Sequence, residues 1–341
     1  MLSRSKQVLF SLLLLATAAI WGASFMVMKD VQEIVPMNYI LAIRFGVAAV
    51  GLAYFLYQGR DKFGWELLKH GFLVGTLLYF AYAVQSYGLF FTTVSKNAVY
   101  CGLNVVVVPF LAWALYRERI AIPVYAAAIL VFMGVYCIAG PISVDSFNYG
   151  DLLSLSSAVL FAAHIIAVSR CSKTSELLPL SCLQFVFASM WGWVFAIFGK
   201  PFPAELTWSE WGGLAWLAVM ATLLAITMMN IGIKYINPTV TAVIFATESP
   251  FACMCGVFFK NDPMTSRIAL GIALVFVALV SSQLGGPSSE NNAESKSESE
   301  SSPDDKQVLP SDTAQDSTQA DQVDKQEPTL SPVQIAELDK P

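Results

Sequence analysis

Residues 97–116 read NAVYCGLNVVVVPFLAWALY, a run that contains no charged side chain. A transmembrane helix needs roughly 20 consecutive, mainly apolar residues, because the hydrocarbon core of a bilayer is about 30 Å thick and a helix rises about 1.5 Å per residue. The run is long enough to cross a bilayer once, and it therefore predicts a membrane-spanning helix.

Nine other runs have a similar length and composition, so the sequence predicts ten spanning helices and an all-α polytopic membrane protein. They cover residues 8–28, 38–57, 71–91, 97–116, 121–139, 150–169, 178–198, 211–231, 239–259 and 266–284. Of the 341 residues, 56% are hydrophobic and 13% are charged. Soluble proteins average about 45–50% apolar and about 25% charged residues. This chain has too few charges to cover a surface in water, so we expect it to lie in lipid.

Residues 285–341 differ in composition from the rest of the chain. They are rich in Ser, Glu, Asp, Gln and Pro, and they hold thirteen acidic side chains against four lysines. Such a segment buries too little apolar surface to offset the conformational entropy of folding. We predict a disordered acidic tail, which also accounts for the formal net charge of −5.

The Lys and Arg residues between the expected spans indicate how the chain is oriented. With a cytoplasmic N-terminus, ten of those before the tail fall on the cytoplasmic side and five on the opposite side. Short cytoplasmic loops of membrane proteins carry an excess of Lys and Arg. We therefore predict a multi-pass protein of a bacterial inner (plasma) membrane, with both termini in the cytoplasm.

The expected spans divide into two related halves. An offset of 144 residues relates Tyr-Gly-Leu at 87–89 to Ile-Gly-Ile at 231–233, and it also pairs Asn104 with Glu248. Self-similarity at a fixed offset is the signature of an internal repeat. The sequence therefore predicts that the bundle is built from two copies of one helical unit.

Each predicted repeat, residues 8–139 and residues 150–284, contains five spans. Because five is an odd number, the second repeat must enter the membrane in the opposite orientation to the first. Inverted repeats place a substrate site near the middle of the bilayer, between the two halves. The pattern predicts a transporter with an inward-open and an outward-open state of similar energy.

Short motifs in these spans resemble those of one known family. They are IWGASF at 20–25, Arg44-Phe45, TTVSKNA at 92–98, GLNVVVVP at 102–109, Arg117-Glu118-Arg119, GDLL at 150–153 and Glu248-Ser249-Pro250. Over about residues 8–284 the chain resembles the EamA-type exporters of the drug/metabolite transporter superfamily. The resemblance implies a ten-helix secondary transporter that exports a metabolite such as an amino acid or an amine, or a drug. The chain departs from the family pattern at Phe161 and at Asn261-Asp262.

Two charged side chains within the expected spans are candidates for function. An ionisable group in hydrocarbon costs about 2.5–3.5 kcal/mol on insertion scales, so each needs a reason to be there. Glu248 lies two residues before Pro250, which lacks a backbone donor and loosens the helix beside the carboxylate. We interpret Glu248 as a proton or cation site, with a structural carboxylate as the alternative. Arg44 either binds a substrate carboxylate or forms a fixed internal ion pair, and the resemblance favours a structural or gating role.

Uncharged polar residues at similar depths form a second group of candidates. His164 can titrate near physiological pH, but no histidine cluster accompanies it, so a role in helix packing is favoured over a role in a cavity. Asn104 and Gln85 either hold a solute by hydrogen bonds or join helices. Asn104 ranks first because it is the repeat mate of Glu248. Trp21, Tyr82 and Tyr100 lie deep enough to line a cavity, with packing as their alternative.

A membrane-embedded enzyme and a non-transporting receptor or scaffold are the competing classes of protein. An enzyme would need a nucleophile with a base, a metal set or paired carboxylates, and the sequence holds no Gly-x-Ser-x-Gly or His-Glu-x-x-His motif. Cys253 and Cys255 lack the further soft ligands of a metal site. We therefore expect no enzymatic activity, no cofactor and no bound metal. The expected partners are a small-molecule substrate, membrane lipid, and a proton or an exchanged solute. The sequence allows an oligomer, and we expect no nucleic-acid partner.

Overall fold

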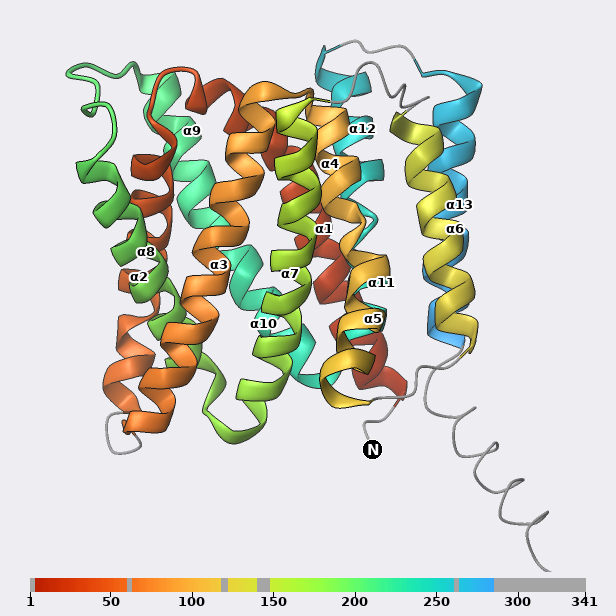
Figure 1. Cartoon of the computed structure of the whole chain (residues 1–341), viewed down its shortest axis with the longest axis horizontal. Coiled ribbons are helices and arrows are strands. Elements are labelled where there is room, and N and C mark those ends of the chain that lie inside the picture. The colour runs from red at the N-terminus through yellow and green to blue at the C-terminus, as the bar shows by residue number, and fades with distance from the viewer. Residues whose placement is uncertain (1–3, 60–62, 118–121, 140–147, 261–263, 285–341) are drawn as a thin grey trace, which may run out of the picture. The chain divides into compact units, whose positions relative to one another are not determined.

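The computed structural model describes residues 4–59, 63–117, 122–139, 148–260 and 264–284, and these residues are helices joined by short connections (Figure 1). The described residues contain no strand. The described residues end at Leu284. The predicted disordered tail, residues 285–341, therefore lies outside them.

The first half of the bundle consists of α1 (Arg4–Gln32), α2 (Met37–Gln58), α3 (Trp65–Phe91), α4 (Val94–Gly102), α5 (Asn104–Tyr116) and α6 (Ile122–Ala139). The second half consists of α7 (Tyr149–Thr174), α8 (Leu177–Ile197), α9 (Trp208–Ala218), the π-helical segment η3 (Val219–Leu224), α10 (Ala225–Tyr235), α11 (Pro238–Phe245), α12 (Glu248–Lys260) and α13 (Ser266–Leu284). The prediction of an all-helical chain is confirmed for the described residues.

Among the described residues, eight helical stretches are long and apolar enough to cross a membrane, so the chain is a multi-pass membrane protein. They are Ser5–Gln32, Met37–Gln58, Trp65–Phe91, Lys96–Tyr116, Tyr149–Thr174, Leu177–Ile197, Trp208–Tyr235 and Pro238–Phe259. Shorter apolar helices, Tyr125–Ile138 and Ser266–Ser281, stand where the fifth and tenth spans were expected. The total of ten spans stays a prediction.

Two of the expected spans are interrupted at positions that the predicted repeat makes equivalent. The span at 97–116 is divided between α4 and α5 at Leu103, and the span at 239–259 is divided between α11 and α12 at Ala246 and Thr247. Pro250 explains the second interruption in part, because it has no N–H group to donate to the carbonyl of Ala246. The residues that open the second helix of each pair are Asn104 and Glu248.

Contacts between helices follow the predicted repeat. α2 packs against α8, and α6 packs against α13 (Figure 1). α5 contacts α7 and α11, while its repeat equivalent α12 contacts α1 and α4. The first part of each interrupted span thus lies against the second part of the other. This arrangement brings both interruptions together in the interior.

Close approach of α2 and α8 depends on Gly192. A Cβ atom on Gly192 would lie 2.7 Å from the backbone N and Cα of Ala42, whereas a Cβ atom on Gly212 of α9 would meet nothing within 4 Å. Small residues at such positions let two helix backbones approach closely in membrane proteins.

We predict that Gly192→Ala lowers the thermal unfolding midpoint of the protein in detergent, because overpacking costs about 1–3 kcal/mol. The matched control, Gly212→Ala, should leave the midpoint unchanged or raise it, because alanine favours a helix over glycine by about 1 kcal/mol. Equal midpoints for the two variants would contradict this account of the α2–α8 contact.

Candidate functional site

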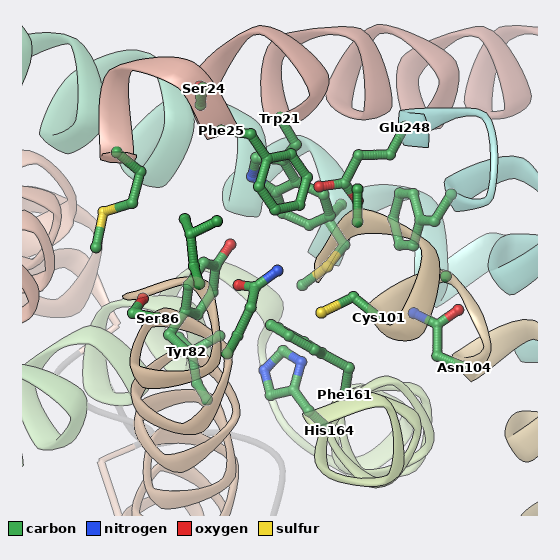
Figure 2. A pocket seen from close by; sticks show the side chains of 18 of the residues that line it. Trp21, Ser24, Phe25, Tyr82, Ser86, Cys101, Asn104, Phe161, His164 and Glu248 are labelled. Carbon is green, nitrogen blue, oxygen red and sulfur yellow. The ribbon is translucent and has the colours of Figure 1, made fainter. Parts of the chain in front are cut away.

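A cavity lies where the two interrupted spans meet (Figure 2). Side chains from α1, α2, α3, α4, α5, α7, α9, α10, α11 and α12 line it, so both halves of the chain contribute. Figure 2 shows Trp21 and Glu248 on one side of the cavity and Phe161 and His164 on the other. The space open to the centres of water molecules is about 70 Å³, and one water takes about 10–15 Å³ of such space. The cavity is therefore narrow in this conformation.

Most of the residues singled out from the sequence meet in this cavity. Its lining includes Trp21, Arg44, Tyr82, Gln85, Asn104, His164 and Glu248. Tyr100 is buried but does not line the cavity. The neighbours of Tyr100 along α4 that do line it are Ala98, Cys101 and Gly102. Their spacing defines one face of a helix, and Tyr100 lies off that face. Whether any of these residues binds a solute stays a prediction.

Glu248 opens α12 at the interruption, and Figure 2 shows its carboxylate directed into the cavity. Among the described residues, no group donates a hydrogen bond to this carboxylate and no cation pairs with it. The structural alternative, a carboxylate bonded to a neighbouring helix, is not formed there. Asn104 opens α5 at the equivalent position, and its Oδ1 atom is buried without a hydrogen-bond partner within the described part of the chain.

Arg44 is almost fully buried. Its Nε atom donates a 2.8 Å hydrogen bond to Oγ1 of Thr222, and its Cζ atom lies 5.0 Å from the centroid of the Tyr82 ring. Its Nη1 atom lies 3.8 Å from the sulfur of Met28. No carboxylate pairs with Arg44 among the described residues. The internal ion pair considered as one alternative for Arg44 is therefore not formed in that part of the chain.

The π-helical segment η3 anchors residues of the cavity wall. The hydroxyl group of Thr222 accepts the hydrogen bond from Arg44 and donates one to the carbonyl of Leu217, at 2.7 Å. Trp21 Nε1 donates to the carbonyl of Ala221 at 2.9 Å. Single π turns inside α-helices are frequently found at functional sites. Sequence reasoning missed Thr222, because a π turn leaves no recognisable signal in an apolar run.

His164 and Gln85 both combine cavity lining with helix contacts. His164 Nε2 lies 3.3 Å from Oε1 of Gln184, which joins α7 to α8. The backbone carbonyl of Gln85 accepts a 3.0 Å hydrogen bond from Nδ2 of Asn97. Each of these residues thus lies both at the cavity and at a contact between helices, and a role in holding a solute stays a prediction.

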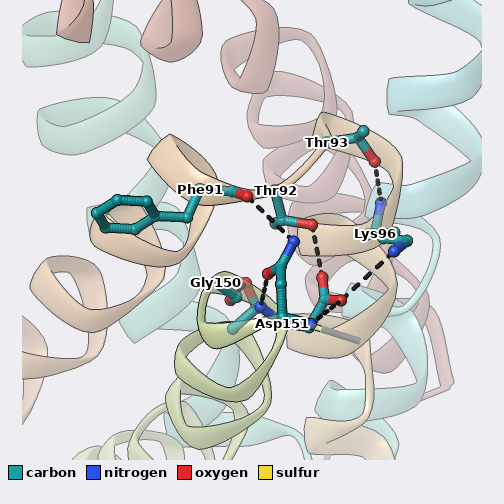
Figure 3. Close-up of polar contacts among 8 residues, drawn as sticks. Phe91, Thr92, Thr93, Lys96, Gly150 and Asp151 are labelled. Atoms are coloured by element: carbon teal, nitrogen blue, oxygen red, sulfur yellow. Dashed lines mark hydrogen bonds and ion pairs between the residues drawn. The ribbon is translucent and has the colours of Figure 1, made fainter. Parts of the chain in front are cut away.

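A second polar cluster joins α3, α4 and α7 at one end of these helices (Figure 3). Asp151 is fully buried and accepts hydrogen bonds from the Thr92 hydroxyl at 2.5 Å and from the Asn148 backbone N–H at 3.1 Å. Lys96 Nζ forms an ion pair with Asp151, at 3.4 Å from its Oδ2 atom. Sequence reasoning did not single out Asp151 as a functional candidate. The pattern Asn148-x-x-Asp151 is a capping box and could have indicated its structural role.

Known proteins share this fold and sequence pattern. The EamA-like transporter family matches residues 9–140 and 148–282. An uncharacterized transporter of Archaeoglobus fulgidus is 27% identical over 263 residues, which cover 77% of this chain and 82% of the relative. The uncharacterized transporter YyaM of Bacillus subtilis is 23% identical over 280 residues, which cover 79% of this chain and 92% of the relative. One crystal structure, 18% identical, superposes with a TM-score of 0.66 and covers 83% of this chain and 98% of its own.

A multi-pass helical bundle with an internal cavity lined by both halves of the chain fits a membrane transporter. The chain belongs to the EamA-like transporter family. The resemblance noted from the motifs is thereby confirmed. Membership of a transporter family also points away from an enzyme.

Asp151, which is fully buried, and Glu248, which is partly buried, allow a contrast between a structural and an unpartnered carboxylate. We predict that Asp151→Asn lowers the thermal unfolding midpoint, because hydrogen bonds to a charged group contribute about 1.5–3 kcal/mol each. Glu248→Gln should leave the midpoint unchanged or raise it, because it removes an uncompensated charge. The measurement is thermal unfolding of both variants in one detergent. A larger loss for Glu248→Gln than for Asp151→Asn would show that Glu248 has a structural partner.

Proposed function

We propose that this protein is a secondary transporter that carries a small organic solute across the bacterial inner membrane by alternating access. One observation carries the proposal: the cavity lies at the two equivalent helix interruptions, and both halves line it. Transporters with inverted repeats bind substrate near the middle of the bilayer, at discontinuous helices. In this proposal the chain has ten spans in two inverted five-helix repeats, residues 8–139 and 150–284, with both termini cytoplasmic.

The paired contacts between helices support two conformations of similar energy. The contact between α5 and α11 is the repeat equivalent of the contact between α12 and α4. If the two repeats exchange their conformations, each of these contacts takes the geometry that the other has now. Each state then satisfies the same set of contacts. The narrow cavity would widen toward one side of the membrane in each state, so that a solute enters from one side and leaves on the other.

A second hollow supports a route between the cavity and one end of the bundle. Lys29, Asp30, Glu33 and Arg267 are the charged residues that line it, and it shares Ala98 and Ser249 with the cavity. The Ser249 hydroxyl donates a 3.3 Å hydrogen bond to the Ala98 carbonyl. We propose that this contact between α12 and α4 closes the route in the present conformation and breaks when the hollow joins the cavity.

Net export, and movement driven by a proton gradient or by an exchanged solute, belong to the same proposal. Glu248 supports proton coupling, because a carboxyl group that has no partner among the described residues and lines a cavity can gain and lose a proton as water enters. Export is proposed because the motifs of the chain resemble those of exporters. In any secondary transporter the direction of flux follows from the gradient.

Filling the cavity tests the proposed function. A Cβ atom on Gly102, which lines the cavity, would meet only the Ser249 Oγ atom at an ordinary 3.6 Å. We predict that Gly102→Leu leaves the protein folded and reduces solute uptake by proteoliposomes to the level of liposomes without protein. Gly212→Leu, which extends into open space, is the matched control and should transport normally.

The solute for this assay comes from a thermal-shift screen of amino acids, amines and nucleosides on the full chain, because a ligand stabilises the state that binds it. Uptake by Gly102→Leu equal to that of the control would contradict transport through this cavity. Absence of uptake by the unaltered protein for every solute in the screen would contradict the proposed function as a whole.

A further inference from the structure

A basic pocket lies between the C-terminal ends of α5, α7 and α10 and the start of α11, and it shares no lining residue with the central cavity. The polar and aromatic residues of its wall are Tyr116, Arg170, Lys173, Lys234, Tyr235 and Asn237. The space open to the centres of water molecules is about 210 Å³, against about 70 Å³ in the central cavity. One water takes about 10–15 Å³ of such space, so the basic pocket has room for a ligand larger than water.

The wall of the basic pocket carries charge of one sign. Arg170 and Lys173 come from α7 and Lys234 comes from α10, while the described residues that line the pocket include no Asp or Glu. Arg170 keeps its positive charge whatever else it contacts, because a guanidinium group does not lose its proton in a protein. A concave wall of one sign raises the local concentration of ions of the opposite sign. The pocket therefore favours an anion.

The two lysines have donors that the described part of the chain does not use. Within that part, Lys173 forms no hydrogen bond and no ion pair, and Lys234 contacts the ring of Tyr235, with Nζ 5.9 Å from the ring centroid. Both lysines are exposed. Each ammonium group has three donors and no acceptor. A ligand in the pocket that is rich in acceptor oxygens can bind both.

Arg170 and Asn237 complete the wall. The Cζ atom of Arg170 lies 4.0 Å from the centroid of the Tyr116 ring, so the ring covers the face of the guanidinium group, whereas phosphate oxygens bind to N–H groups in its plane. Oδ1 of Asn237 accepts a 2.9 Å hydrogen bond from the backbone N–H of Thr239. The amide group of Asn237 thus has its donor end for a ligand.

Two general rules account for part of this pattern without a ligand. Lys173 and Lys234 stand in the last turns of α7 and α10, where a cation complements the negative end of the helix dipole. Cytoplasmic ends of membrane proteins are also rich in Lys and Arg. Both rules explain the sign of the charge at one helix end. Neither explains why cations of two helices surround one pocket that has no acidic residue in its described wall.

We propose that the basic pocket binds a phosphate group, carried either by an anionic lipid or by a small soluble phosphate ester. A phosphate group combines negative charge with several acceptor oxygens, which matches the separate donors of the wall. Basic pockets between transmembrane helices bind acidic lipid headgroups. Tyr116 and Tyr235 are exposed, and tyrosine rings are common at the level of the headgroups. This site is distinct from the central cavity and does not depend on the proposed transport function.

Three probes separate the phosphate group from the acyl chains. Dioctanoyl phosphatidic acid carries both, glycerol 3-phosphate carries the phosphate group without chains, and dioctanoylglycerol carries the chains without phosphate. Apparent dissociation constants are measured by native mass spectrometry of the full chain in a non-ionic detergent, at neutral pH and one ionic strength.

We expect dioctanoyl phosphatidic acid to bind more tightly than dioctanoylglycerol. Lys173→Gln and Lys234→Gln should each weaken its binding about fivefold, which is the contribution of one basic residue near an anionic headgroup, and the double variant about 25-fold. Lys173→Arg keeps the charge and should bind like the unaltered protein. The matched control is Lys69→Gln, which removes an exposed lysine of α3 outside the pocket and should leave binding unchanged.

The source of the phosphate group follows from the same measurements. If glycerol 3-phosphate also binds and loses affinity in the lysine variants, a soluble phosphate ester is a sufficient ligand, whereas lysine-dependent binding of phosphatidic acid alone identifies a lipid site. The inference is overturned if neither phosphate probe binds more tightly than dioctanoylglycerol, or if Lys69→Gln weakens binding as much as the pocket variants do. Because Lys173 and Lys234 are exposed, their variants should keep the thermal unfolding midpoint of the unaltered protein.

Discussion

Every peptide group in the interior of a bilayer must find a hydrogen-bond partner within the protein, and this constraint determines where helices can be interrupted. Irregular backbone is tolerated at membrane depth only where protein buries it or where it lines a cavity. Residues beside the interruptions at Leu103 and at Ala246–Thr247 line the cavity, and η3 binds Trp21 and Arg44 of its wall. Side chains bond to carbonyls at these places, as Trp21 does at Ala221 and Thr17 at Ala225. The candidate site thus lies where the helical hydrogen-bond pattern is interrupted and side chains bond to backbone carbonyls instead.

The same constraint separates the two kinds of charged residue in the bundle. Asp151 is fully buried but receives donors from three helix ends, so its charge contributes to holding α3, α4 and α7 together. Arg44 and Glu248 lie beside space that a ligand can occupy. A charge that is paired inside the fold stabilises the bundle, whereas Arg44 and Glu248 have no oppositely charged partner among the described residues.

The sequence predicted the helical class and the family, and seven of its eight candidate site residues line the cavity. Apolar runs, a repeat and isolated polar residues are all visible without coordinates. It also indicated that the helix is loosened beside Glu248, through Pro250. It did not reveal that Asn104 marks an equivalent interruption, because the nearest proline, Pro109, lies inside α5 rather than at its start. Tyr100 does not line the cavity, because it lies on another face of α4 than Ala98, Cys101 and Gly102. The sequence alone does not show which face of a helix points toward a cavity. Thr222 was invisible because the contact that gives it a role spans 178 positions of the chain.

The π-helical segment gives this protein one place where a helix can lose a residue without changing its register. A π turn accommodates one residue more than an α-helical turn spanning the same rise. Deleting a single residue within 219–224 would therefore let the turn close as an ordinary α-helical turn, and the residues after it would keep their orientation. Asn230, whose Nδ2 donates a 2.9 Å hydrogen bond to Ser181 of α8, would then keep its partner. A deletion just after this segment, in regular α-helix, would instead rotate all later residues of the helix by about 100°, because an α-helix has 3.6 residues per turn.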